Sequence, residues 1–369
     1  MAPDALRKKW PAATLCKSAP QACTSAASLA MQVRMASVAI CICTYRRPLQ
    51  LDRLLQELAD QRWKRLRQPS IAVVVVENEA GGVAEEVCLK HIALNRLNIL
   101  YSSEPRPGVA MARNRCSEIA AQFSEFIAFI DDDELPAKDW LEQLMLLQQA
   151  TEADVVAGKV LGSYLNPPPP WLVSTRIHDT SPPVAVNGSK WGRLVTGLLH
   201  PFPALASIAS GSRIEWCDTG NVLFRTDIVR RGFRFDETMG ELGYGTDTLF
   251  FRQVARSGYK MVWSNEAVAY HEIPPERATA AWIIRRSLQQ GFCAVVIESR
   301  FRGRAARRIE TAFFGLAWAF VNVAVAAVSL IADRRRYVWH MSEAARWLGR
   351  CAAILGMTVR YNRRAASPT

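Results

Sequence analysis

Four consecutive acidic residues follow a short apolar run near the middle of this sequence. The run is Phe126–Ile130, and the acids are Asp131, Asp132, Asp133 and Glu134. A continuously apolar run of this length is typical of a strand buried on both faces, and its abrupt end marks the edge of a sheet. Crowded carboxylates repel one another unless a cation neutralises them, and their oxygens suit Mg²⁺ or Mn²⁺. We therefore expect a divalent-metal site here or, equally well, an acidic turn that begins a helix.

The elements around these acids alternate between buried strands and helices, which predicts an α/β fold with a doubly wound, mostly parallel sheet. In such a sheet, the loops that bind ligands follow the carboxyl ends of the strands. The expected strands are 37–43, 71–76, 97–101, 126–130, 154–162 and 261–270, and residues 215–224 are expected to form two strands joined by a tight turn. Helices are expected at 49–58 and 83–95, before Gln122, after Trp140 and after Thr246.

Side chains able to bind a phosphorylated ligand follow the first two expected strands. Thr44, Tyr45 and Arg47 offer a hydroxyl, a ring for stacking and a cation. Glu77 ends the second strand and could accept hydrogen bonds from a nucleotide base. Arg113 lies on the helix that leads to the acidic stretch. A solvated surface would explain any one of these charges, but three charged loops at one sheet edge favour a binding site.

Two more polar residues stand at the ends of elements in the second half of the chain. Asp247 follows Thr246, the expected helix cap, and an acid in a first helical turn is common without any catalytic role. His271 is expected to end the last strand, as either a surface group or a metal ligand. The proline-rich stretch 163–213 is long for a loop, which indicates a lid, an acceptor site or a stiff spacer.

Composition and charge exclude several classes of protein. Hydrophobic residues make up 50% of the chain and charged residues 22%, which is ordinary for a globular protein. The net charge of +12 comes from the ends of the chain, because residues 281–369 hold fifteen arginines against four acids. A nucleic-acid-binding domain would itself be basic, so we expect no nucleic-acid partner. Scattered cysteines without a C-x-x-C pair indicate a reducing compartment and no zinc site.

The C-terminal region 281–369 is expected to be basic, helical and membrane-associated. Thr311–Ala332 is a stretch of 22 residues without a charge, long enough to cross a bilayer. Arginines flank both ends, and a single span would place one basic cluster outside, against the positive-inside tendency. We therefore expect a helix at the cytoplasmic face of the inner (plasma) membrane, held by anionic lipid. The alternative is a helix buried against the preceding domain or a second subunit. Residues 1–35 lack a sustained apolar run and are expected to be a disordered extension.

Seven segments of the chain, in order, resemble family 2 glycosyltransferases with the GT-A fold, particularly bacterial members of the succinoglycan and exopolysaccharide type. They are CTYRRP, VVVVEN, EPRPGVAMARNR, FIAFIDDDELP, TGNVLFR, GTDTLFFRQVARSGY and AYHEIPPER, and the whole match runs from about Ser37 to Arg286. The resemblance implies a GT-A domain over residues 36–280. It also implies a divalent metal, Mg²⁺ or Mn²⁺, a nucleotide-sugar donor and a lipid-linked or glycan acceptor.

The resemblance assigns roles to individual residues. Asp131 and Asp133 match the D-x-D pair of the family, which implies that Asp133 holds the metal. His271 matches a position that often helps to hold it, and Asp247 matches the general base. The remaining matches imply contacts with the nucleotide sugar, and they are Thr44, Tyr45, Arg47, Glu77, Arg113, Asn114, Asp131 and Asp132.

Two positions depart from the family pattern. Thr246 stands where the first acid of a Glu-Asp motif is expected, and Glu77 stands where the family usually has an Asp that reads the base. The retained Asp247 implies an inverting, metal-dependent, hexosyltransferase-like enzyme that uses a UDP-sugar. Thr246 leaves open a non-catalytic, membrane-attached scaffold that only binds a nucleotide sugar. A nucleotidyltransferase is disfavoured because no Gly-rich phosphate-binding segment lies near the N-terminus.

Overall fold

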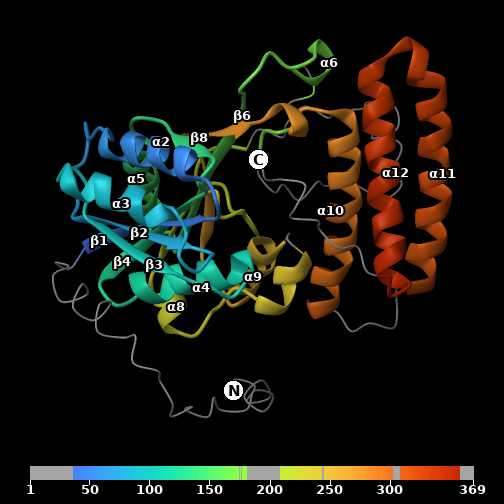
Figure 1. Ribbon diagram of the computed structural model, residues 1–369. Coiled ribbons are helices and arrows are strands. Elements are labelled where there is room, and N and C mark those ends of the chain that lie inside the picture. The colour runs from blue at the N-terminus through green and yellow to red at the C-terminus, as the bar shows by residue number, and fades with distance from the viewer. Residues whose placement is uncertain are drawn as a thin grey trace, which may run out of the picture. The chain divides into compact units, whose positions relative to one another are not determined.

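The computed structural model describes residues 36–173, 175, 177–180, 208–242, 245–301 and 308–357, which belong to one compact unit. The expected extension 1–35 and most of the proline-rich stretch, residues 181–207, lie outside the described residues. An eight-stranded sheet with the order β3-β2-β1-β4-β7-β6-β8-β5 carries helices on both faces (Figure 1).

The first four strands are parallel, as predicted. Helices α2 and α5 pack on one face of these strands, and α4 packs on the other. Strand β2 is therefore buried along nearly its whole length, which explains why its sequence is apolar without alternation. The strands are β1 (Ala36–Thr44), β2 (Ile71–Glu77), β3 (Ile99–Ser103) and β4 (Ser124–Ile130), and the helices are α2 (Pro48–Ala59), α3 (Ala84–Ala93), α4 (Val109–Ala120) and α5 (Trp140–Thr151).

The second half of the sheet is mixed. Strand β7 (Asn221–Arg225) lies antiparallel between β4 and β6 (Val155–Tyr164). Strand β8 (Met261–Ile273) runs parallel to β6 and antiparallel to the short edge strand β5 (Glu134–Pro136). The remaining elements of this half are α6 (Pro170–Val173), α8 (Asp227–Arg230), α9 (Thr246–Arg256) and the 3₁₀ turns η2 (Glu237–Leu242) and η3 (Pro275–Arg277).

Four local predictions are wrong in detail. Residues 215–219, expected to form a strand, have no regular secondary structure, and only β7 joins the sheet. Glu134 begins β5 rather than a helix, because it pairs with His271, which lies inside β8 rather than at its end. Gly245, with φ at +86°, occupies the position before α9, so that Thr246 is the first helical residue and not its cap.

Three long helices form the C-terminal region: α10 (Ala280–Phe301), α11 (Arg308–Ala332) and α12 (Arg334–Ile354). Helix α12 packs against both of the others (Figure 1). Two glycines bring the backbones of α10 and α12 together: a Cβ at Gly291 would lie 1.8 Å from the Arg346 carbonyl oxygen, and one at Gly349 would lie 1.9 Å from that of Leu288. Any larger residue at these two positions would force the helices apart.

Helix α11 has an apolar face that no described residue covers. Phe320 is 75% exposed, Val328 81% and Ile331 98%. Phe314–Ile331 is long and apolar enough to cross a membrane by length and composition, and only 28% of this stretch is buried. The alternative in which the preceding domain buries this helix is therefore not what the structure shows.

Candidate active site

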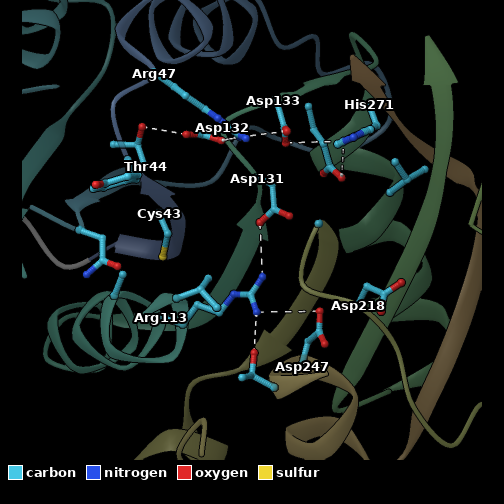
Figure 2. Close-up of a pocket in the computed structure, with 18 of the residues that line it drawn as sticks. Cys43, Thr44, Arg47, Arg113, Asp131, Asp132, Asp133, Asp218, Asp247 and His271 are labelled. Atoms are coloured by element: carbon cyan, nitrogen blue, oxygen red, sulfur yellow. Dashed lines mark hydrogen bonds and ion pairs between the residues drawn. The ribbon is translucent and has the colours of Figure 1, made fainter. Parts of the chain in front are cut away.

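A cavity of about 440 Å³ opens at the carboxyl edge of strands β1 and β4 (Figure 2). Helices α4, α9 and α10, strands β5, β6 and β8 and the loops beside β2 and β7 also contribute to its wall. Most of the residues singled out in the sequence line it, although they come from five separate segments of the chain. Those that line it are Thr44, Tyr45, Arg47, Arg113, Asp131, Asp132, Asp133, Asp247 and His271.

Asp132 ties the loop after β1 to the end of β4. Its carboxylate accepts hydrogen bonds from the Thr44 hydroxyl at 2.8 Å and from Arg47 Nη1 at 2.7 Å. Burial raises the pKa of Asp132 to about 6, although Arg47 opposes the shift. The residue is 5% exposed, so its main effect is to hold Thr44 and Arg47 in the wall of the cavity.

Asp133 lies among three nitrogen-bearing side chains. Arg47 Nη1 is 2.9 Å and Arg277 Nη1 is 3.2 Å from its Oδ2, and His271 Nδ1 is 3.6 Å from its Oδ1. The β5–β8 pairing brings His271 to this place, because the Glu272 N–H donates to the Asp133 carbonyl at 2.9 Å. Burial disfavours the charged Asp133, but the three neighbours outweigh it and hold its pKa below the usual range. Burial also lowers the pKa of His271, which favours the neutral imidazole.

The side chains around Asp133 fit a hard divalent ion. Asp133 supplies carboxylate oxygens, and the neutral imidazole of His271 supplies a nitrogen ligand. No three metal-ligating side chains among the described residues are arranged as a complete site. That is expected where a nucleotide binds, because Mg²⁺ is commonly held by one or two carboxylates together with substrate phosphates.

Arg113 joins the two acids on either side of the cavity. Its guanidinium donates to the Thr246 hydroxyl at 3.0 Å and lies 3.7 Å from Asp131 and 3.9 Å from Asp247 (Figure 2). Its side chain is 8% exposed, so these partners stabilise a buried charge. Asp247 sits in the first turn of α9, where its Oδ1 accepts the Thr248 N–H at 2.8 Å.

Several residues of the cavity were missed in the sequence, Arg277 among them. Asp218 lies in the turn before β7, and Trp282 and Arg286 are one helical turn apart on α10. Burial, followed by the neighbouring Asp247, raises the pKa of Asp218 to about 7. The expectation of a strand at 215–219 hid Asp218, although an Asp just before Thr219 and Gly220 is a common turn signal.

Glu77 and Asn114 do not line the cavity. Glu77 is 1% exposed, and its carboxylate accepts hydrogen bonds from the Ala84 N–H at 3.2 Å and the Tyr101 hydroxyl at 2.8 Å. Asn114 bonds both the N–H and the carbonyl of Phe235, at 2.8 and 2.9 Å. Both side chains fix surrounding loops, so this geometry does not support their predicted contacts with a nucleotide.

Two solved structures resemble this fold. Mannosyltransferase PcManGT from Pyrobaculum calidifontis, in complex with GDP-Man and Mn²⁺, aligns with a TM-score of 0.53 and 16% identity over 88% of each chain. Residues 1–349 of S. aureus TarS, in complex with UDP-GlcNAc, align with a TM-score of 0.45 and 16% identity over 88% of this chain and 94% of that one. The similarity to PcManGT confirms the predicted GT-A-type fold.

Sequence comparison identifies the family. The model of the family described as "Glycosyl transferase family 2" matches residues 39–206. Succinoglycan biosynthesis protein ExoM of Rhizobium meliloti (strain 1021) is 30% identical over 251 residues, which cover 68% of this chain and 71% of that protein. The predicted resemblance to succinoglycan-type enzymes is therefore confirmed, and this chain belongs to glycosyl transferase family 2.

Proposed function

We propose that this glycosyltransferase is inverting and metal-dependent, and that it moves a sugar from a UDP-sugar to a glycan or lipid-linked acceptor. The observation that carries the proposal is that the D-x-D acids and Asp247 face one cavity from opposite sides, with Arg113 between them. A donor held at Asp133 and an acceptor held at Asp247 would meet in this space.

The donor side is the half of the cavity around Asp133. Asp133 and His271 would hold the divalent ion, which as a Lewis acid stabilises the charge on the departing diphosphate. Arg47 and Arg277 face the same carboxylate and would add positive charge beside the phosphates. Asp131 would contact the sugar or ribose, and Tyr45 lines the wall where the nucleotide enters.

The acceptor side is the half around Asp247. The acceptor hydroxyl oxygen bonds to the anomeric carbon as the bond from that carbon to the diphosphate oxygen breaks. Asp247 takes the hydroxyl proton, and the nucleoside diphosphate leaves with the electron pair of the broken bond. Attack from the face opposite the leaving group inverts the anomeric centre.

The sharpest test replaces the proposed general base, Asp247, by a residue of nearly the same size and shape that cannot accept a proton. Asp247→Asn is expected to lower the transfer rate by about a hundred- to ten-thousand-fold, because the amide cannot take the proton. UDP binding, measured by calorimetry with Mn²⁺, should not change. The exposed Glu215→Gln is the matched control, with wild-type transfer and binding. Full transfer by Asp247→Asn would overturn the assignment of the base. A wild-type protein that binds UDP-sugars but never transfers the sugar would instead be the non-catalytic, nucleotide-sugar-binding scaffold.

A membrane-surface location suits such an acceptor. The exposed apolar face of α11 lies between arginines at Arg308 and Arg334–Arg336. We propose that this face lies in the cytoplasmic interface of the inner membrane, where the arginines contact anionic lipid head groups. Residues 281–369 would then be a membrane-associated region that also contributes Trp282 and Arg286 to the cavity.

A further inference from the structure

Three residues of the cavity wall are not used by the donor side proposed above. Asp218 comes from the turn before β7, and Trp282 and Arg286 come from α10. None of these segments supplies a residue to the donor side. All three residues line the same cavity as Asp247, and Figure 2 shows Asp218 on the Asp247 side, away from Asp132 and Thr44.

Asp218 and Asp247 form a pair of carboxyl groups. Burial is the main cause of the raised pKa of Asp218, and Asp247 and Asp131 add to it electrostatically, whereas Arg286 and Arg113 oppose it. The charge of Asp247 therefore acts on Asp218 across the cavity that both residues line. The acceptor side therefore offers two hydrogen-bonding carboxyl groups instead of one.

Helix α9 lacks the acid that was expected before Asp247. Thr246 occupies the position before Asp247, where an acid was expected, and its hydroxyl accepts a hydrogen bond from Arg113. Thr246 is 1% exposed and bound in this way, so it has little capacity to hold an acceptor. Asp218 supplies a carboxyl group beside Asp247 from a different segment of the chain.

We propose that Asp218 binds a second hydroxyl of the acceptor, next to the hydroxyl that Asp247 deprotonates, and that the acceptor is therefore a sugar ring. This inference rests on the proposed function. Neighbouring ring hydroxyls can bond to two carboxyl groups that line one cavity, and the half-buried Trp282, which packs against His178 with the ring centroids 5.7 Å apart, adds an aromatic side chain to the same wall. An anionic lipid phosphate would be repelled by Asp131, Asp218 and Asp247.

The experiment compares sugar and phosphate acceptors. Transfer from a panel of UDP-sugars is measured to octyl β-D-glucopyranoside, octyl β-D-galactopyranoside, their monodeoxy analogues and undecaprenyl phosphate. The enzymes are the wild type, Asp218→Asn, Asp218→Glu and the exposed control Glu215→Gln. UDP affinity in the presence of Mn²⁺ is measured for each variant by calorimetry.

Asp218→Asn is expected to raise the acceptor KM about ten- to a hundredfold, because a hydrogen bond to a charged group is lost. UDP affinity should stay at the wild-type value, and Asp218→Glu should restore part of the acceptor affinity. With the wild-type enzyme, one monodeoxy acceptor should show a similar rise in KM. With Asp218→Asn, removal of that hydroxyl should raise KM no further, since the mutation and the deoxy change affect the same contact.

Other results would overturn the inference. For Asp218→Asn, they are an acceptor KM equal to that of the wild type, a weaker UDP affinity, or a rise in KM that adds to that of every deoxy acceptor. For the wild-type enzyme, the contradicting result is transfer to undecaprenyl phosphate and to no glycoside. Failure of the proposed function looks different, because the wild-type enzyme would then transfer sugar to none of the acceptors.

Discussion

At the scale of residues, the cavity is a balance of acids and arginines. Arg47 and Arg277 face Asp133, and Arg113 faces Asp131 and Asp247. A nucleoside diphosphate adds further negative charge to this space. Its binding therefore depends on these cations and, under our proposal, on a metal ion at Asp133.

Removal of the Asp133 carboxylate should separate the effect of the metal from that of the arginines. The wild-type enzyme is expected to bind UDP more tightly with Mn²⁺ than without it, and Asp133→Ala should lose this gain. Calorimetric titration of UDP with and without Mn²⁺ measures both values, and Asp60→Ala, an exposed acid outside the cavity, is the control. An undiminished Mn²⁺ effect in Asp133→Ala would exclude Asp133 as the ligand.

The acceptor side should respond to pH through Asp218. Burial raises its pKa to about 7, Asp247 and Asp131 add to the shift, and Arg286 and Arg113 oppose it. The charged carboxylate accepts the stronger hydrogen bond, so kcat/KM for a glycoside acceptor should rise with pH through about 7. The profile of Asp218→Asn should lack this rise, and an identical profile for both enzymes would contradict the assignment.

The same shift has a consequence for stability. The folded protein binds the Asp218 proton more tightly than the unfolded chain, whose Asp pKa is about 3.9. The stabilisation from this proton is complete below pH 4 and is lost as the pH rises to about 7. Asp218→Asn should therefore gain melting temperature over the wild type at pH 8 and not at pH 4, as scanning calorimetry can show.

Residues that carry a motif could be predicted from the sequence, and residues placed only by tertiary contacts could not. Asp131, Asp133 and Asp247 line the cavity together, and the sequence singled them out because each matches a family motif. Trp282 could not be found, because it lies in an amphipathic helix and only the fold turns it toward the cavity. Glu77 lies outside the cavity wall, and its position at a strand end says nothing of Tyr101, which bonds its carboxylate, so its contact with a base stays a prediction.

At the scale of elements, two pairings build the site from distant parts of the chain. The β5–β8 pairing places His271 beside the acidic stretch. The close contact of α10 with α12 holds the helix that carries Trp282 and Arg286. Strand positions were predictable from apolar runs, but an antiparallel edge pairing such as β5–β8 depends on a three-residue strand that gives no periodic signal.

Gly349 tests the second pairing. A Cβ there would lie 1.9 Å from the Leu288 carbonyl oxygen, so Gly349→Ala must separate α10 from α12. We expect a cost of about 1–3 kcal/mol and a lower melting temperature, because the extra methyl group overpacks the contact. The acceptor KM should rise while UDP affinity holds. The exposed Leu348→Ala is the control on the same helix, and a Gly349→Ala enzyme as stable as the wild type would contradict this packing.

At the scale of the whole molecule, the acidic residues and the basic, apolar surface lie in different parts of the protein. The cavity is rich in acids, whereas residues 281–369 hold fifteen arginines and the exposed apolar face of α11. The proposed acceptor side, with Asp218 and Asp247, is therefore suited to a neutral sugar, and the C-terminal helices are suited to an anionic surface. Helix α10 belongs to both, because it lines the cavity and packs on α12.

Membrane binding should depend on both the arginines and the α11 face. We expect the protein to bind phosphatidylglycerol vesicles more strongly than phosphatidylcholine vesicles, with weaker binding in high salt, because exposed charges are screened. Val328→Asp should reduce binding, since it places a charge on the apolar face, whereas Leu94→Asp on an exposed site of the preceding domain should not. Vesicle flotation measures each case. Complete release of the protein from membranes by carbonate, together with equal flotation of Val328→Asp and the wild type, would instead mean that a second protein surface covers α11.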